Sequence, residues 1–290
     1  MKADKLMVSE ETGHAAEQAA HGGEGGGASG QVLIDHVTDS GVWHLFKDVH
    51  ITLPEIHLFG LDLSISLHVL MMWISAALVF GLFAGMARSM KRSENNVARG
   101  GFALLEMMVE FVRDEIAYTT MGKSLGRKMT PLMLTFFFFI LFCNLLGLFP
   151  FMATATGNIN VTAALAILAF IIVQGQGIRH NGLMGYVKSF VPSGVPLFLV
   201  PIIFPIEVMG QFTRHFALCM RLFANMIAGH VVILALITLI FIFGSILVSP
   251  ISVGLSLFMY LLEILVAFIQ AYIFAMLAGL FIGMAAHPDH

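Results

Sequence analysis

Ionisable residues interrupt the apolar stretches in the last third of the chain, among them Glu207, Arg214, Arg221, His230 and Glu263. A charged side chain in the centre of a bilayer costs about 2.5 to 3.5 kcal/mol on insertion scales, so such residues usually mark an ion or proton pathway. Histidine changes charge near neutral pH, and a buried carboxyl group can also hold or release a proton there. The set predicts proton transfer within a membrane.

The spacing of these residues divides them between two faces of one helix. With 3.6 residues per turn, Glu207, Arg214 and Asn225 lie within about 40° of Arg221. His230 follows Arg221 by nine residues and lies on the opposite side. We therefore expect one polar compartment around Glu207 and Arg214 and another around His230, with Arg221 between them.

The last apolar stretch carries a polar stripe of its own, because Gln270 follows Glu263 by seven residues, close to two helical turns. We expect Glu263 to share the compartment of His230. The two could form a buried structural pair without transport, or they could exchange protons. Proton relays are the commoner use of such groups inside membranes.

Arg221 stands in the apolar sequence ALCMRLFANMIAGH. It could pair with a carboxylate elsewhere in the chain, or its long side chain could reach the membrane surface. A functional charge is the interpretation that the sequence favours, because a cation in such a stretch requires a compensating interaction.

Composition places the chain in a bilayer. Hydrophobic residues make up 58% of it and charged residues only 11%, against about 25% charged in soluble domains, and its mean hydropathy is +0.89. A net charge of −3 suggests no nucleic-acid partner. Cys143 and Cys219 lie in apolar runs without metal-ligand spacing, and the glycines form no phosphate-binding loop, so the sequence predicts no metal and no cofactor.

Hydropathy predicts an all-α membrane protein with about five membrane-embedded helices and one interfacial amphipathic helix. The embedded segments are 65–87, 131–149, a shorter run opening at 161–173, and the long stretches 216–248 and 251–286. The amphipathic segment is 102–121, where charged residues interrupt an apolar face at helical spacing.

The last two stretches, of 33 and 36 residues, would form helices of about 50 and 54 Å, whereas the hydrocarbon core is about 30 Å thick. Two ordinary spans with protruding ends could have this length. Because both consecutive segments are too long, a strongly tilted hairpin is the better prediction.

Basic residues set the expected orientation in a bacterial plasma membrane. Eight of the fifteen Lys and Arg residues lie in segment 88–128, which should be cytoplasmic, whereas 150–160 and 249–250 contain none and should lie outside. This places the N-terminus outside and the C-terminus in the cytoplasm. Residues 1–62 are expected to be a flexible outside tail without a cleaved signal peptide, with low-complexity sequence at 13–30. Residues 63–290 would form the membrane-embedded proton-channel domain.

Several motifs together resemble subunit a of the F-type ATP synthase. They are MRLFANMIAGH at 220–230, ILVAFIQAYIF at 264–274, NINVT at 158–162, GYVKSFVP at 185–192, and Glu207 fourteen residues before the arginine. The resemblance covers roughly residues 65–287.

The resemblance implies a non-catalytic stator subunit of the Fo sector, which forms two offset proton half-channels against the rotating c-ring and couples proton translocation to ATP synthesis. It implies that Arg221 faces the c-ring carboxylates. It also implies an outer half-channel with His230 and Glu263 and an inner one near Glu207. The full set of pathway residues is His230, Glu263, Glu207, Gln270, Asn225, Asn158, Asn160, Thr213 and Arg214. The implied partners are c-ring proteolipids, peripheral-stalk b subunits and the lipid bilayer, and the transported ion is the proton.

The chain departs from the family pattern at three positions near the arginine. His215, Ala217 and Ala224 stand where Pro, Ser and Gly are common. Some members also exchange the histidine and the glutamate between the two long helices, and here the histidine comes first, at 230. We expect the exchange to preserve proton handling and the change at Ala224 to alter local packing.

Two other classes of protein are weaker candidates. A secondary transporter or a membrane arm of a respiratory complex would also use buried charges, but such chains usually show internal repeats, and no convincing repeat is visible here. An intramembrane enzyme would need a nucleophile with a base or a metal-binding motif such as HExxH, which the scattered histidines do not form.

Overall fold

The computed structural model describes residues 42–46, 49–52, 57–58, 61–62, 66–92, 101–149, 152–191, 196, 198–243 and 248–286. The low-complexity segment 13–30 lies outside these residues. The flexible, outside character of the N-terminal tail stays a prediction. Within residues 42–62 the chain forms two short antiparallel hairpins that the sequence analysis did not anticipate: β1 (Val42–Phe46) with β2 (Val49–Thr52), and β3 (His57–Leu58) with β4 (Leu61–Asp62).

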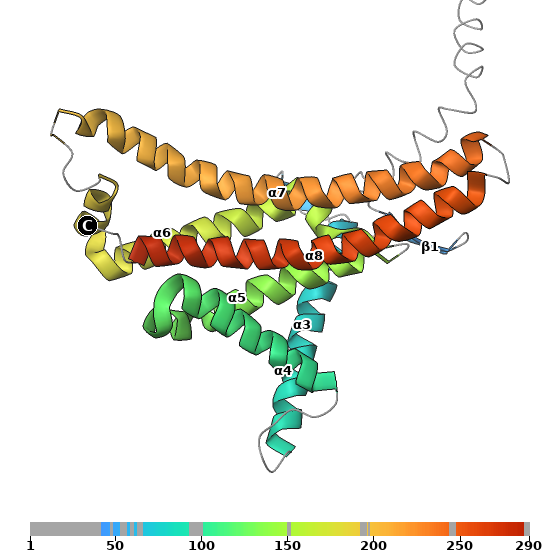
Figure 1. Ribbon diagram of the computed structural model, residues 1–290, viewed down its shortest axis with the longest axis horizontal. Coiled ribbons are helices and arrows are strands. Elements are labelled where there is room, and N and C mark those ends of the chain that lie inside the picture. Colours follow the sequence, from blue (N-terminus) through green and yellow to red (C-terminus); the bar gives the residue numbers. More distant parts are fainter. Residues whose placement is uncertain are drawn as a thin grey trace, which may run out of the picture.

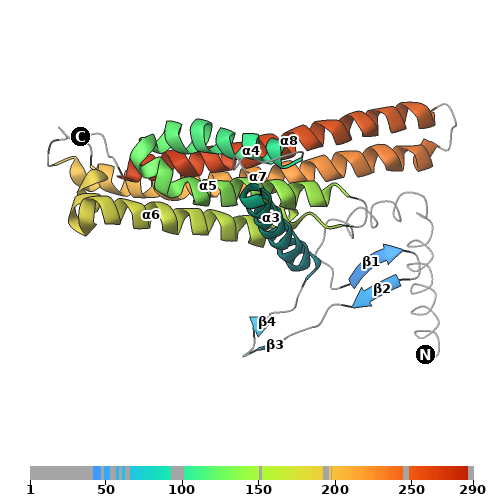
Figure 2. The same cartoon turned by 90° about the horizontal axis from the view of Figure 1, so that it is seen from below.

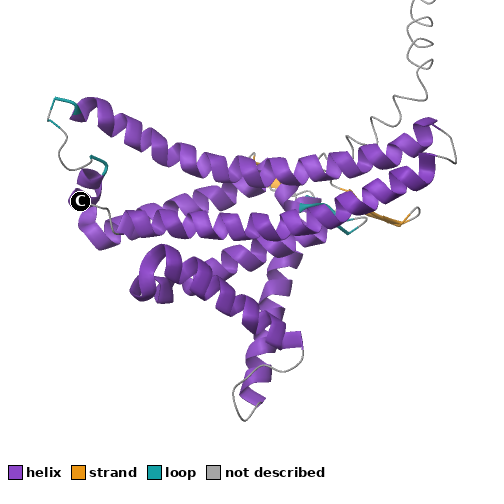
Figure 3. Cartoon of the chain, viewed as in Figure 1, coloured by secondary structure: helices purple, strands orange, loops and turns teal. Residues whose placement is uncertain are grey.

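The all-α membrane fold is confirmed. Five helices in the described part are long and apolar enough to cross a bilayer: α3 (Leu67–Arg92), α5 (Thr119–Gly147), α6 (Ile159–Ser189), α7 (Val200–Phe243) and α8 (Val248–Ala286). Helices satisfy their backbone hydrogen bonds internally, which is the condition for crossing hydrocarbon. Figure 3 shows how completely helices dominate the described chain.

Two very long helices form one side of the molecule. With 44 and 39 residues, α7 and α8 would extend about 66 and 58 Å, roughly twice the hydrocarbon thickness. They pack against each other as a hairpin, with α5 and α6 alongside, whereas α3 crosses this group steeply (Figures 1 and 2). The long hairpin predicted from hydropathy is therefore present.

The helix boundaries differ from the hydropathy estimate in two places. Helix α6 continues past the apolar run at 161–173 to Ser189, with a break at Gly182, where φ is +69°. Its polar residues find partners within the fold: the Tyr186 hydroxyl donates to Gln174 Oε1 at 2.5 Å, and Asn181 Nδ2 donates to Ala285 O at 2.9 Å. Likewise α7 begins at Val200 rather than near residue 216, because Pro205 and Glu207 fit within its first turns.

The amphipathic helix is also present, as α4 (Gly101–Phe111) and the π-helical segment η1 (Val112–Tyr118). Val112 and Ile116 are buried, whereas Arg113 is partly exposed, Asp114 is exposed, and the two form an ion pair of 2.8 Å. The chain then enters α5 and reverses at Gly122, whose φ of +72° favours glycine. The reversal lays η1 against α5.

The core lies mainly between α5 and α8. Phe137 and Phe138 of α5 and Phe274 of α8 are among the largest fully buried side chains. Near the C-terminal end of α8, Gly279 and Gly283 form a small-xxx-small pair. They pack against Thr120, beside the chain reversal at Gly122, and this turn is called the Thr120 elbow. A Cβ at Gly279 would lie 2.7 Å from Thr120 Oγ1, and one at Gly283 would overlap the Thr120 carbonyl oxygen. The elbow docks closely because these positions lack side chains.

We predict that Gly283→Ala lowers the thermal unfolding temperature of the detergent-solubilised protein. The new methyl group would meet backbone, which cannot rotate away, and overpacking of this kind costs about 1–3 kcal/mol. Gly254→Ala on the same helix is the matched control, because nothing lies within 4 Å of its Cβ position. Equal unfolding temperatures for the two variants would contradict close docking of the elbow.

Candidate functional site

Helices α7 and α8 bring His230 and Glu263 together. His230 Nδ1 lies 2.9 Å from Glu263 Oε1, and Glu263 is only 4% exposed. The contact is a close approach rather than an aligned hydrogen bond, because Nδ1 also lies 3.0 Å from Met226 O, one helical turn earlier, and the Glu263 carboxyl oxygens receive no hydrogen bond from the described residues. The sequence placed both residues in one compartment, and the structure has them in contact.

Gly229 makes this contact possible. An added Cβ there would lie 2.5 Å from Glu263 Oε1 and 2.7 Å from its Cδ. The carboxyl group thus packs directly on the backbone of α7, beside His230.

The other ring nitrogen of His230 faces the segment between α5 and α6. Nε2 lies 2.9 Å from Gly147 O and 2.9 Å from Thr154 Oγ1. Thr154 is buried and directly precedes the short 3-10 helix η2 (Ala155–Gly157). The imidazole therefore touches protein polar atoms on both sides.

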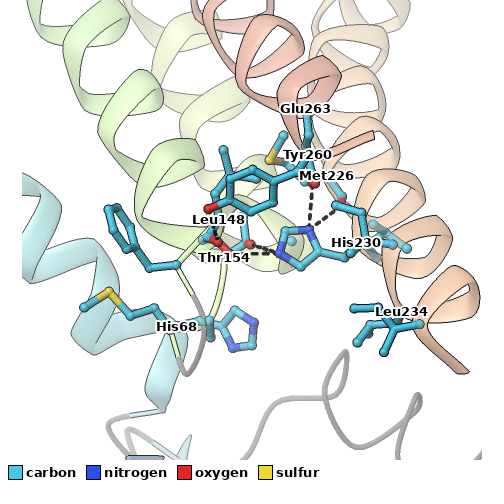
Figure 4. A pocket seen from close by; sticks show the side chains of 16 residues that line it. His68, Leu148, Thr154, Met226, His230, Leu234, Tyr260 and Glu263 are labelled. Carbon is cyan, nitrogen blue, oxygen red and sulfur yellow. Dashed lines mark hydrogen bonds and ion pairs between the residues drawn. The ribbon is translucent and has the colours of Figure 1, made fainter. Parts of the chain in front are cut away.

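This pair borders a cavity of about 380 Å³. Figure 4 shows side chains from α3, α7, α8 and the segment after α5 arranged around it. Its polar lining side chains are His68, Thr154, His230, Tyr260 and Glu263. Since a water molecule occupies about 30 Å³ in the liquid, the cavity has room for several.

Arg221 lies about two and a half turns before His230 on α7 and is exposed on the surface of the chain. No carboxylate among the described residues forms an ion pair with it. Three exposed alanines lie near it on the same face of α7: Ala217, Ala224 and Ala228. Ala217 and Ala224, which depart from the family pattern, are still small residues. Another helix could therefore approach the guanidinium closely.

Asn225 and Gln270 link the two long helices one turn from Arg221. Asn225 Nδ2 donates to Gln270 Oε1 at 2.8 Å. Gln270 is 2% exposed, so its amide would be costly to bury without this partner. The bond fixes the register of α7 and α8 beside the arginine.

Glu207 and Arg214 form a second polar group, nearer the start of α7. Their side chains are 3.9 Å apart and partly exposed. Thr213 is exposed and donates to Met209 O at 2.9 Å. This group is separate from the His230 cavity, which contains none of these three residues in its lining.

His215, where the family often has proline, is buried between the rings of Phe170 and Phe281. Its Nδ1 donates to Gln211 O at 2.9 Å, because a carbonyl oxygen can only accept. The histidine thus packs α7 against α6 and α8.

Asn158 and Asn160 are not among the residues that line the cavity. Asn158 caps the N-terminus of α6, accepting from the Asn160 backbone N–H at 2.9 Å. Such a cap is the common structural role of asparagine at this position.

Sequence reasoning missed Thr154, Tyr260 and the buried Asn144, which accepts from the Thr156 hydroxyl at 2.6 Å. Their only signal was a polar residue near an apolar segment, which occurs too often to single out a site. Their contacts depend on how α5, α6 and α8 pack.

Comparison with known families agrees with this arrangement. The profile of the ATP synthase A chain family matches residues 69–283. The chain belongs to the ATP synthase subunit a family. The sequence-based resemblance is thereby confirmed.

Similar proteins cover most of the chain. Subunit a of Chloroherpeton thalassium is 49% identical over 89% of this chain and 77% of its own length. Subunit a of Myxococcus xanthus is 51% identical over 79% and 77%, and subunit a 2 of Prosthecochloris aestuarii is 46% identical over 95% and 85%. As a member of the subunit a family, the chain is a membrane component of the ATP synthase Fo sector and takes part in ATP synthesis and proton transport.

We predict that Gly229→Ala separates Glu263 from His230 with little effect on stability. The new methyl group would meet the end of a flexible side chain, which can rotate away, so the loss is local. A structure of the variant should show the Nδ1–Oε1 distance well beyond 2.9 Å. Gly210→Ala on the same helix has open space at its Cβ position and should leave the pair intact. A pair unchanged in Gly229→Ala would show that the carboxyl group does not rest on this glycine.

Proposed function

We propose that this chain is the stator subunit that forms two offset proton half-channels against a rotating ring of c subunits and couples proton flow to ATP synthesis. The observation that carries the proposal is Arg221: an exposed guanidinium in the middle of α7, with no ion-pair carboxylate among the described residues, between two separate polar groups. Its partner would be a carboxylate on a c subunit.

The cavity at His230 and Glu263 supports the outer half-channel. An imidazole and a carboxyl group can each hold or release a proton, and here the two lie 2.9 Å apart at the edge of the cavity, so the charge on one favours or disfavours protonation of the other. In the proposal, protons reach this pair through the cavity and continue along α8 toward the ring.

Glu207, Arg214 and Thr213 support the inner half-channel. They are partly exposed and lie toward the start of α7, away from the cavity. A proton released from the ring after nearly a full rotation would leave along this group. The two paths are offset along the hairpin, so the ring must turn for a proton to cross.

Arg221 acts as the barrier between the paths. Its guanidinium stays charged at any physiological pH, so it attracts an ionised ring carboxylate and repels direct proton flow. The Asn225–Gln270 bond would hold the two helices in register beside it. Asn158 and Asn160 remain expected contributors near the outer mouth.

The membrane potential supplies the energy. Each elementary charge that moves down 100 mV releases about 2.3 kcal/mol, and a ring that carries several protons per product accumulates enough for synthesis. ATP chemistry itself would belong to other subunits. In the proposal the chain sits in a bacterial plasma membrane with its N-terminus outside and its C-terminus in the cytoplasm, and peripheral-stalk b subunits hold it against the ring.

We predict that Arg221→Ala assembles into the complex but abolishes ATP-driven proton pumping in membrane vesicles. Without the fixed cation the two half-channels are no longer insulated, and the ring carboxylate loses its partner. Arg127→Ala, which removes an exposed arginine of α5, should pump normally. Near-normal pumping by Arg221→Ala would rule out the proposed mechanism.

We predict that the double variant His230→Ala with Glu263→Ala slows passive proton conduction through Fo by about a hundredfold, the usual scale for loss of a positioned acid–base pair. The rotor should stay bound, because neither residue lies on the exposed face around Arg221. Conduction is measured in vesicles after removal of the catalytic head. Glu110→Ala is the control, because it removes an exposed carboxylate of α4 that does not line the cavity. Unchanged conduction would remove the pair from the pathway.

A further inference from the structure

His230 Nε2 has two neighbours of different hydrogen-bonding character. Gly147 O and Thr154 Oγ1 both lie 2.9 Å away. A carbonyl oxygen can only accept a hydrogen bond, whereas a hydroxyl group can donate or accept. Nδ1, on the other side of the ring, donates to Met226 O.

This arrangement satisfies Nε2 in both of its protonation states. When Nε2 carries a proton, the N–H donates to Gly147 O. When the proton has left, the lone pair accepts from the Thr154 hydroxyl, and Nδ1–H keeps its bond to Met226 O. Without that hydroxyl only the protonated state would have a partner among the described residues, and an acceptor that loses its positioned donor is less favourable.

Thr154 is held where this role requires. The residue is 7% exposed, and its carbonyl accepts from Gly157 N at 2.9 Å, which ties it to the start of η2. An added Cβ at Gly147 would overlap Thr154 Oγ1, so the glycine lets the hydroxyl approach the end of α5.

The other titratable groups around His230 do not duplicate this contact. Glu263, from α8, faces Nδ1. Tyr260, also from α8, donates its hydroxyl hydrogen to Leu148 O at 2.8 Å. His68, from α3, lines the same cavity. The segments after α5 and before α6 contribute no ionisable side chain to the lining.

We propose that Thr154 is a positioning residue for proton transfer, whose hydroxyl stabilises the neutral, proton-accepting form of His230. This inference rests on the proposed outer half-channel. A proton arriving through the cavity adds to the Nε2 lone pair, the Thr154 O–H turns away, and the new N–H bonds to Gly147 O. Release of the same proton reverses these steps. With Gly147 O and the Thr154 hydroxyl as alternative partners, His230 can accept the next proton.

The test compares Thr154→Val, which keeps the shape but removes the hydroxyl, with Thr154→Ser, which keeps the hydroxyl. Both are measured in the intact complex for passive proton conduction through Fo. We expect Thr154→Val to conduct about tenfold more slowly, a smaller effect than the roughly hundredfold or more for loss of the positioned acid or base itself, and Thr154→Ser to conduct like the unchanged protein. Thr154→Ala, which introduces no steric strain, should behave like Thr154→Val.

A spectroscopic readout separates this role from simple packing. Nitrogen-15 NMR of histidine-labelled complex, with His230→Gln to assign the signal, reports how much of His230 is neutral at a given pH. The neutral fraction should fall in Thr154→Val and stay unchanged in Thr154→Ser.

Normal conduction in Thr154→Val would overturn the inference, as would slow conduction with an unaltered neutral fraction. If Thr154→Val conducts normally while the His230 and Glu263 double variant is blocked, only this inference fails. If the double variant conducts normally, the proposed half-channel itself fails.

Discussion

An arginine keeps its positive charge wherever the chain places it, and a bilayer offers little to balance that charge. The charge of Arg221 therefore requires a balancing interaction near the middle of α7. In the described part of the chain Arg221 is exposed beside Ala217, Ala224 and Ala228, and no carboxylate forms an ion pair with it. The proposed function assigns this cation a carboxylate partner on a rotor subunit of the ATP synthase, the complex to which members of the subunit a family belong.

The length of the hairpin formed by α7 and α8 lets it carry separate polar groups. Helices α7 and α8 far exceed the thickness of hydrocarbon, so polar groups can be spread along them without meeting. Glu207 with Arg214 lies toward one end, and His230 with Glu263 borders the cavity beyond Arg221. Glycines at close contacts, Gly229 beneath Glu263 and Gly283 beneath the Thr120 elbow, keep the helices near enough to hold this arrangement.

Much of this was predictable from the sequence, because the controlling signals are periodic or rare. Apolar length predicted the membrane helices, and a charge in an apolar run singled out Arg221. Helical spacing separated His230 from Glu207. Pairing of His230 with Glu263 needed only the assumption of a hairpin.

The remainder depended on packing between distant segments. Thr154 lies in a short connection whose sequence gives no hint that its hydroxyl meets a histidine 76 residues later. The continuation of α6 through its polar residues required partners such as Tyr186 and Ala285, which only the folded chain supplies. Asn158 was predicted as a pathway residue from a family motif, and the folded chain shows in addition that its side chain caps α6.

The most direct test of the central claim is a high-resolution structure of the intact ATP synthase containing this chain. We expect the Arg221 guanidinium to face a carboxylate of a ring subunit beside Ala217, Ala224 and Ala228, with the Asn225–Gln270 bond next to it. An Arg221 side chain paired with a carboxylate of its own chain, or directed to lipid away from the ring, would contradict the account.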